Sequence, residues 1–97
     1  MKNFLILHYG FERPTPEEME EWNKWFTSVE KRRVDRGHLP GGREITKSGS
    51  KELPFAKDSI TGYTVIEAED LDEAEKIAGE CPIVLSTRVY EIRKSLG

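Results

Sequence analysis

The sequence contains a single cysteine, Cys81, and therefore cannot form an internal disulfide bond. A fold stabilised by internal disulfide bonds is therefore excluded. A free thiol is typical of the reducing cytoplasm, where we expect this chain to act. Cys81 closes an apolar helix pattern directly before Pro82. We interpret it as a buried structural thiol, because the alternative, a catalytic nucleophile, needs a basic neighbour that lowers the thiol pKa.

Long apolar runs and an excess of basic residues are also missing. The longest apolar run, Phe4 to Leu7, is too short to cross a membrane or to form the core of a signal peptide. Lysine and arginine number 15 against 18 aspartates and glutamates, which gives a net charge of −3. This weakly acidic balance argues against binding to a nucleic-acid backbone. We expect neither a membrane nor a nucleic acid as a partner.

The short motifs of common enzyme sites are absent as well. There is no nucleophile elbow, phosphate-binding loop or dinucleotide glycine pattern. The two histidines, His8 and His38, are far apart in the sequence and have no clustered carboxylate or thiol beside them, so we expect no metal site and no cofactor. His38 stands beside a Gly/Pro loop and is predicted to be exposed to solvent.

What the sequence does contain is a succession of strand patterns. Residues 60–68 are rich in β-branched and aromatic side chains and are apolar on both faces, which predicts a central strand. Residues 3–9 show the same two-sided pattern. Weaker patterns predict a short edge strand around 43–47 and a last strand at about 87–93, and residues 52–59 are predicted to be a polar connection.

Two helices alternate with these strands. The first begins with a capping box at Thr15 and is predicted to run to about Arg36, with basic residues near its negative end and a cap at Gly37. The second begins with a capping box at Asp70 and ends before Pro82. Their predicted core-facing side chains are Met19, Trp22, Trp25, Phe26 and Val29 in the first helix and Leu71, Ala74, Ile77, Ala78 and Cys81 in the second.

The order strand, helix, strand, strand, helix, strand predicts an α+β fold of the ferredoxin-like split βαβ type. Such a fold has a four-stranded antiparallel sheet with two helices on one face. The 97 residues suffice for a single domain, 1–97. Because the strands are apolar on both faces, the face without helices would expose an apolar surface in a monomer. We therefore predict a homodimer that pairs the two uncovered faces.

Several segments in this order resemble the YCII-related, or DGPF-domain, family. They are Asn3-Phe4-Leu5-Ile6-Leu7-His8-Tyr9-Gly10, the Pro-Thr-Pro-Glu-Glu-Met helix start with Trp22 and Trp25-Phe26, Pro54-Phe55-Ala56, the run from Gly62 to Ala74, and Cys81-Pro82. The resemblance covers nearly the whole chain. It implies the dimeric α+β barrel, in which two ferredoxin-like sheets pack together, and a His/Asp enzymatic site in some members. Glu52-Leu53 stands where the family has Asp-Gly, so a role of that Asp or Gly cannot be transferred.

The predicted topology gathers polar residues near one rim of the sheet. As a candidate catalytic pair we take His8 and Asp58, because a carboxylate beside an imidazole fixes its tautomer, raises its pKa and lets the other nitrogen take up a proton. An arginine nearby could hold an anionic group. The candidate ligand-binding residues are Tyr9, Arg13, Lys57 and Arg88.

Two functions of different classes stay open at this point. One is a small enzyme that performs proton transfer or hydrolysis on a small anionic molecule. The other is a non-catalytic ligand-binding or interaction module that uses the same cleft, in which His8 is a satisfied structural histidine and Asp58 forms a turn before Ser59. They differ in whether His8 and Asp58 come within hydrogen-bond reach inside a concavity.

Overall fold

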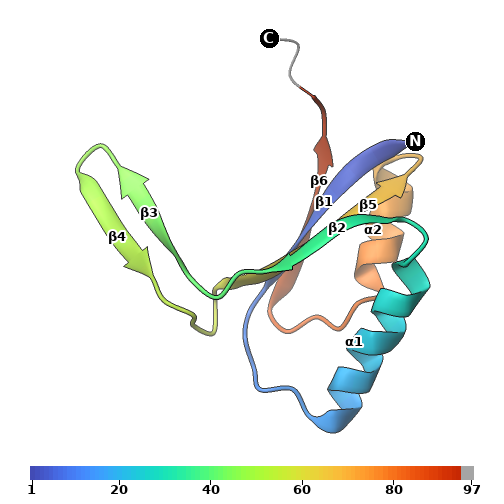
Figure 1. The fold of residues 1–97 in the computed structure, drawn as a ribbon, viewed down its shortest axis with the longest axis horizontal. Helices are drawn as coiled ribbons and strands as arrows, with labels where there is room; N and C mark the ends of the chain where they lie inside the picture. The colour runs from blue at the N-terminus through green and yellow to red at the C-terminus, as the bar shows by residue number, and fades with distance from the viewer. Residues whose placement is uncertain (95–97) are drawn as a thin grey trace.

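The structure, a computed structural model, describes residues 1–94. Its elements are β1 (Lys2–Tyr9), α1 (Pro16–Val29), β2 (Arg33–His38), β3 (Gly42–Thr46), β4 (Gly49–Leu53), β5 (Ile60–Ala68), α2 (Leu71–Gly79) and β6 (Ser86–Ile92). Four antiparallel strands form the main sheet in the order β2-β5-β1-β6, and β3 pairs with β4 in a separate hairpin. Both helices cover one face of the main sheet (Figure 1). The predicted α+β ferredoxin-like fold is confirmed.

The two central strands, β1 and β5, supply the core. Their alternation directs Phe4 and Ile6 from β1, and Thr64, Ile66 and Ala68 from β5, toward the helices, where all five are buried. The helices contribute to the same cluster Trp25, Val29, Ala74, Ala78 and, just after α2, Cys81. The small alanines of α2 let this helix approach the sheet closely, and Cys81 is buried as predicted.

On the opposite face of the sheet, no helix lies within residues 1–94 (Figure 1). The cross-strand partners there put Tyr63 beside Leu7, Val65 beside Leu5, and Leu5 beside Tyr90. These side chains are half-buried or exposed, and Tyr90 keeps 48% of its surface in water. The structure thus has an apolar sheet face with no cover, as the strand patterns predict.

The first helix is shorter than predicted. α1 ends at Val29, and residues 33–38, which we expected to lie in the helix up to Arg36, form the edge strand β2. The chain turns where the Arg32 N–H donates to the Val29 carbonyl, and β2 then pairs with β5. Gly37 is not a helix cap: the Tyr63 ring lies over it, and a Cβ there would come within 2.3 Å of that ring. Pairing with a central strand outweighs the local helix preference of this basic segment.

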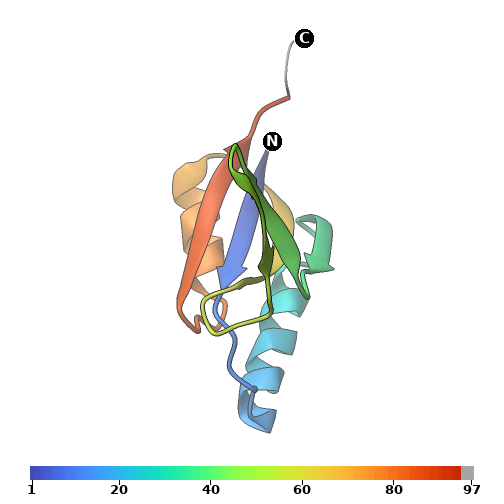
Figure 2. The ribbon, with the colours of Figure 1, turned by 90° about the vertical axis from the view of Figure 1, so that its left-hand side faces the viewer.

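The strand predicted around 43–47 is also placed differently. Because β2 already occupies the edge beside β5, the segment has no free neighbour in the main sheet, and it pairs with β4 instead. β4 takes up the first two residues of the predicted polar connection 52–59. The hairpin projects on the side of the sheet away from the helices (Figures 1 and 2). Every residue of β3 and β4 is exposed.

The helix faces agree with the prediction except at their ends. Trp25 and Val29 are buried, and Trp22 and Phe26 are half-buried against the core. Met19 and Leu71, expected in the core, are 55% and 52% exposed because each lies in the first turns of its helix. No helix among the described residues is long and apolar enough to cross a membrane.

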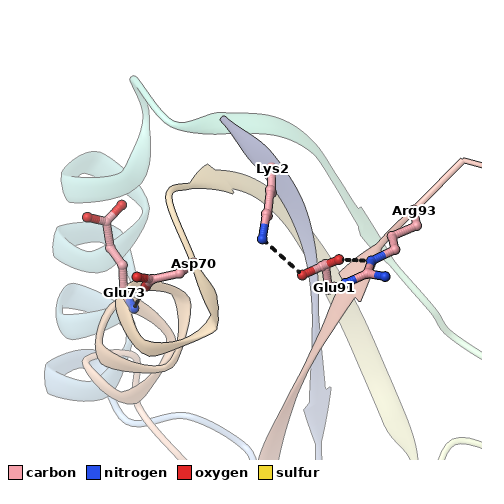
Figure 3. A network of polar contacts seen from close by, with 5 residues as sticks. All are labelled: Lys2, Asp70, Glu73, Glu91 and Arg93. Atoms are coloured by element: carbon pink, nitrogen blue, oxygen red, sulfur yellow. Dashed lines mark hydrogen bonds and ion pairs between the residues drawn. The ribbon is translucent and has the colours of Figure 1, made fainter.

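Polar contacts fix the ends of several elements. At the start of α2, the Asp70 carboxylate accepts the Glu73 N–H at 2.8 Å, the predicted cap. On β6, Glu91 lies between Lys2, at 3.7 Å, and Arg93 (Figure 3). Exposed ion pairs of this kind add little stability, so they orient strand ends rather than hold the fold together.

Trp25 should matter most for stability among the aromatic residues of α1. It is 3% exposed, and its indole N–H donates to the Ile77 carbonyl at 2.9 Å, which links α1 to α2. We expect Trp25→Ala to lower the free energy of unfolding by about 3–5 kcal/mol in urea titrations, and the half-buried Trp22→Ala to cost less. A larger loss for Trp22→Ala would contradict this assignment of the core.

Candidate functional site

A cavity of about 520 Å³ lies between α1 and the helix-covered face of β5 and β2. Its volume is within the range of small-molecule sites in proteins. The cavity is partly open to solvent. Its walls come from β1 (His8), α1 (Trp22, Asn23 and Phe26), β2 (Arg36, Gly37 and His38) and β5 (Thr61, Gly62, Tyr63 and Thr64).

The register of the sheet builds the floor of this cavity. Gly62 on β5 is the cross-strand partner of His8 on β1 and of His38 on β2. Residues directly opposite each other project to the same face, so both imidazoles stand on the helix side with a glycine between them. A Cβ at Gly62 would lie 2.9 Å from the Gly37 carbonyl oxygen, so this position requires a glycine. The missing side chain leaves open space between the two histidines.

His8 is the inner wall of the cavity and is only 8% exposed. Its Nε2 lies 3.1 Å from the Thr64 hydroxyl, and the indoles of Trp22 and Trp25 meet its ring edge-on at 5.2 and 5.6 Å between centroids. Burial lowers the pKa of His8 from 6.5 to about 4. The imidazole is therefore neutral near pH 7, with a proton on one ring nitrogen and a lone pair on the other.

The second ring nitrogen of His8 faces a thiol. Cys81 Sγ lies 4.0 Å from His8 Nδ1 and 3.7 Å from the Thr87 hydroxyl. Burial raises the pKa of the Cys81 thiol, so it stays protonated. The four side chains that contact the His8 ring, Thr64, Cys81, Trp22 and Trp25, are all uncharged, and desolvation is the cause of its lowered pKa.

The predicted pairing of His8 with Asp58 does not occur in this structure. The His8 ring points to the helix face and contacts Thr64 and Cys81. Asp58 is exposed in the connection before β5, which runs beside the chain after β1 through the Gly10 N–H bond to the Ser59 carbonyl. The rise of the His8 pKa was expected only for a paired carboxylate; with no such partner at the ring within residues 1–94, burial lowers the pKa.

The four predicted ligand-binding residues lie outside the cavity. Tyr9 and Arg88 are on the uncovered face, where the Arg88 guanidinium carbon lies 4.8 Å from the Tyr9 ring centroid. Arg13 and Lys57 are exposed in connections between elements. The six residues predicted to share one rim of the sheet therefore lie on different sides of it. Of these six, His8 alone lines the cavity.

Two basic residues at the solvent-exposed edge of the cavity, which we call its mouth, were not predicted from the sequence. Arg36 and His38 are exposed, as expected for His38, yet both line the cavity because they alternate on the same face of β2. The Arg36 guanidinium carbon lies 4.4 Å from the Phe26 ring centroid, and Arg36 forms no ion pair within residues 1–94. Their i, i+2 spacing could have identified them, had 33–38 been assigned to a strand.

The site carries positive rather than negative groups. In the part of the chain that the structure describes, no aspartate or glutamate lines the cavity. No three His, Cys, Asp or Glu side chains among residues 1–94 come together in a way that could hold a metal ion. The arrangement offers hydrogen bonds, a neutral imidazole and a guanidinium to a bound molecule.

A family model for the YCII-related domain matches residues 3–95. The chain belongs to the YCII-related family. This confirms the resemblance noted in the sequence. A search of curated proteins finds no match.

One solved structure similar to this YCII-related chain is 5-chloro-2-hydroxyhydroquinone dehydrochlorinase from Burkholderia phenoliruptrix, in complex with 2,5-dihydroxybenzoquinone. The two chains superpose with a TM-score of 0.56 and 18% identity, over 96% of this chain and 95% of the other. At this identity the likeness concerns the fold.

The lowered pKa of His8 predicts how stability depends on pH. The unfolded chain takes up the imidazole proton below about pH 6.5, whereas the folded chain does so only below about pH 4. Between these values the unfolded state binds more protons, so the free energy of unfolding should fall as the pH falls, by up to about 3 kcal/mol in total. Urea titrations of the wild type and His8→Gln should show this part of the pH dependence in the wild type alone.

Histidine titration by NMR tests whether Asp58 affects the pKa of His8. Asp58→Asn should leave the titration of His8 unchanged, because the two side chains are not paired. A lower His8 pKa in Asp58→Asn than in the wild type would restore the His/Asp pair and contradict the geometry described above.

Proposed function

We propose that this YCII-related protein is a small-molecule enzyme that transfers a proton at His8. The observation that carries this proposal is a buried, neutral imidazole at the inner wall of a cavity that opens to solvent. A neutral imidazole can accept a proton at one nitrogen and donate at the other. Because the only cysteine is a free thiol, we place the enzyme in the reducing cytoplasm.

The surroundings of His8 support this role. The two indoles meet the ring edge-on, and the buried Thr64 hydroxyl contacts Nε2, so the ring is held in one place at the cavity wall. A proton can thus move between a bound molecule and a ring of fixed position. Positioned acid or base groups of this kind accelerate proton transfer by roughly 10²–10⁴-fold.

The size of the cavity supports a small substrate. Its volume of about 520 Å³ suits a molecule of one or two rings. The similar dehydrochlorinase holds a small quinone, which agrees with this size class although it does not identify the substrate of this chain.

A non-catalytic binding module is the second candidate. The observation in its favour is that both ring nitrogens of His8 already face protein groups, Thr64 and Cys81. A histidine satisfied in this way can be purely structural. The Nδ1 to Sγ separation of 4.0 Å is long for a hydrogen bond, however, so this partner constrains the ring weakly.

Phenylpyruvate provides a test that needs no knowledge of the natural substrate. It has an aromatic ring, a carboxylate and a methylene whose protons are acidified by the adjacent carbonyl. In deuterated water we expect the wild type to accelerate deuterium incorporation at this methylene, measured by NMR, and His8→Gln to lose about 10²-fold of that acceleration. Asp58→Asn is the control and should retain it. Bound phenylpyruvate that exchanges only at the rate in buffer would favour the binding module.

The assembly is the second part of the proposal. We propose a homodimer through the uncovered sheet face, because Leu5, Leu7 and Tyr90 form an apolar surface that neither α1 nor α2 covers. The β3–β4 hairpin adds support: it stands on the same side of the sheet, and Ile45 within it is 80% exposed. An isolated two-stranded hairpin is marginally stable in water, whereas a second copy on the uncovered face would give it a surface to pack on.

Light scattering at micromolar concentration tests the dimer. The wild type should have twice the chain mass of 11.2 kDa, and Leu7→Lys should shift it to the monomer because a charge would be buried in the interface. Met19→Lys makes the same chemical change at an exposed position of α1 and should leave the dimer intact. A wild type of single chain mass would reject the assembly.

A further inference from the structure

The mouth of the cavity carries two basic side chains that take no part in the proposed proton transfer at His8. Arg36 and His38 are exposed, alternate on β2 and line the cavity from the same side. The Arg36 guanidinium rests on the Phe26 ring, which limits its movement and keeps it at the cavity edge. Since it has no carboxylate partner within residues 1–94, its charge is available to a ligand.

The space next to these groups lies between the sheet and two aromatic rings of α1. Its floor is the sheet at Gly62, which has no side chain, and its roof on α1 is formed by Trp22 and Phe26, stacked with 5.6 Å between centroids and 26° between planes. Strands lie about 4.8 Å apart, so the backbones of His8 and His38, two strands apart, are separated by roughly 10 Å. The aromatic faces of Trp22 and Phe26 favour a planar ring in this space, because such rings stack on each other.

The two ends of this space differ in polarity. The inner end holds the neutral His8, whose Nε2 lies 3.1 Å from the Thr64 hydroxyl, and neither group carries a charge. The outer end holds the Arg36 guanidinium, a donor with the geometry to bind a carboxylate through two parallel hydrogen bonds. No acidic side chain is among the lining residues that the structure describes, and the nearby Asp35 carboxylate is already bound by the Tyr63 hydroxyl and the Arg36 N–H.

We propose that the cavity binds a planar organic anion, an aromatic or enolic carboxylate, with its anionic group on Arg36 and His38 and its ring over Gly62 facing His8. This inference rests on the proposed function, since it names the class of molecule on which His8 acts. It makes Arg36 and His38 specificity residues: they select an anion, and the distance from the mouth to the inner wall sets which ring atom faces the imidazole.

Three probes separate charge from shape. Benzoate is planar and anionic, benzyl alcohol is planar and neutral, and cyclohexanecarboxylate is anionic but not planar. In calorimetric titrations of the full chain we expect benzoate to bind about tenfold or more tightly than benzyl alcohol, because a charge-assisted hydrogen bond is worth about this factor. Benzoate should also bind more tightly than cyclohexanecarboxylate, because only a planar ring can stack on the aromatic side chains of α1; equal affinities for these two anions would overturn the planar part of the proposal. Equal affinities for benzoate and benzyl alcohol would overturn the proposal, as would the absence of benzoate binding up to its solubility limit.

Substitutions at the mouth locate the anion. Arg36→Gln should weaken benzoate binding about tenfold and leave benzyl alcohol binding unchanged, and His38→Gln should weaken benzoate binding in the same direction. Arg43→Gln removes the same charge from the exposed strand β3, outside the cavity, and should have no effect. Both mouth residues are exposed, so the variants should melt as the wild type does. Benzoate affinity that is insensitive to Arg36→Gln would overturn the assignment.

The binding result and the catalytic result can fail separately. Benzoate binding that depends on Arg36, together with phenylpyruvate exchange that does not depend on His8, would keep the ligand class and reject the proton transfer. Phenylpyruvate exchange that depends on His8, together with equal affinities for benzoate and benzyl alcohol, would keep the proton transfer and reject the anion site at Arg36.

Discussion

The antiparallel pairing of β1 with β5 is the constraint on which the rest of this structure depends. Its register sets Phe4 opposite Ile66 and Ile6 opposite Thr64, so that one face of the central pair is buried under the helices. The same register leaves Leu5 and Leu7 on the other face. Because the side-chain period of a strand is two, a slip of one residue would exchange these faces and turn the core out to solvent.

The same register places a cavity residue in line with the core residues of β1. His8 continues the row of Phe4 and Ile6 and is therefore directed into the protein, where it meets Trp22, Trp25 and Thr64. A polar residue in a core position must be hydrogen-bonded or remain neutral, and His8 does both. The site is thus an extension of the hydrophobic core in which Gly62 leaves a gap, rather than a rim at the end of the sheet.

The connection between α1 and β2 shows how local and long-range forces compete in this chain. Basic residues near the end of α1 are compatible with a longer helix, but β5 offers an unpaired edge that must be satisfied. The turn after Val29 is further held by the Arg32 guanidinium, which lies 2.7 Å from the Glu73 carboxylate on α2. Once the chain turns there, Arg36 and His38 fall on the helix-covered face of β2 and complete the cavity.

The sequence by itself determined the elements whose patterns are strong and local. The β-branched run of β5 has the predicted bounds, the caps at Thr15 and Asp70 are present, and the burial of Cys81 follows from its apolar helix pattern. The ferredoxin-like order and the uncovered apolar face follow from the same patterns, because alternation and capping act between residues close in sequence. These features could be predicted from neighbouring residues alone.

Only the tertiary structure decided where the site lies. The direction of His8, its distance from Asp58 and the approach of Arg36 and His38 depend on pairings between segments more than twenty residues apart. The sequence does not show which edge of β5 takes a partner, or that residues 33–38 leave α1 to become that partner. The physical reason is that the backbone groups of a free strand edge can pair with any segment that reaches it. Which segment does so depends on the packing of the whole chain.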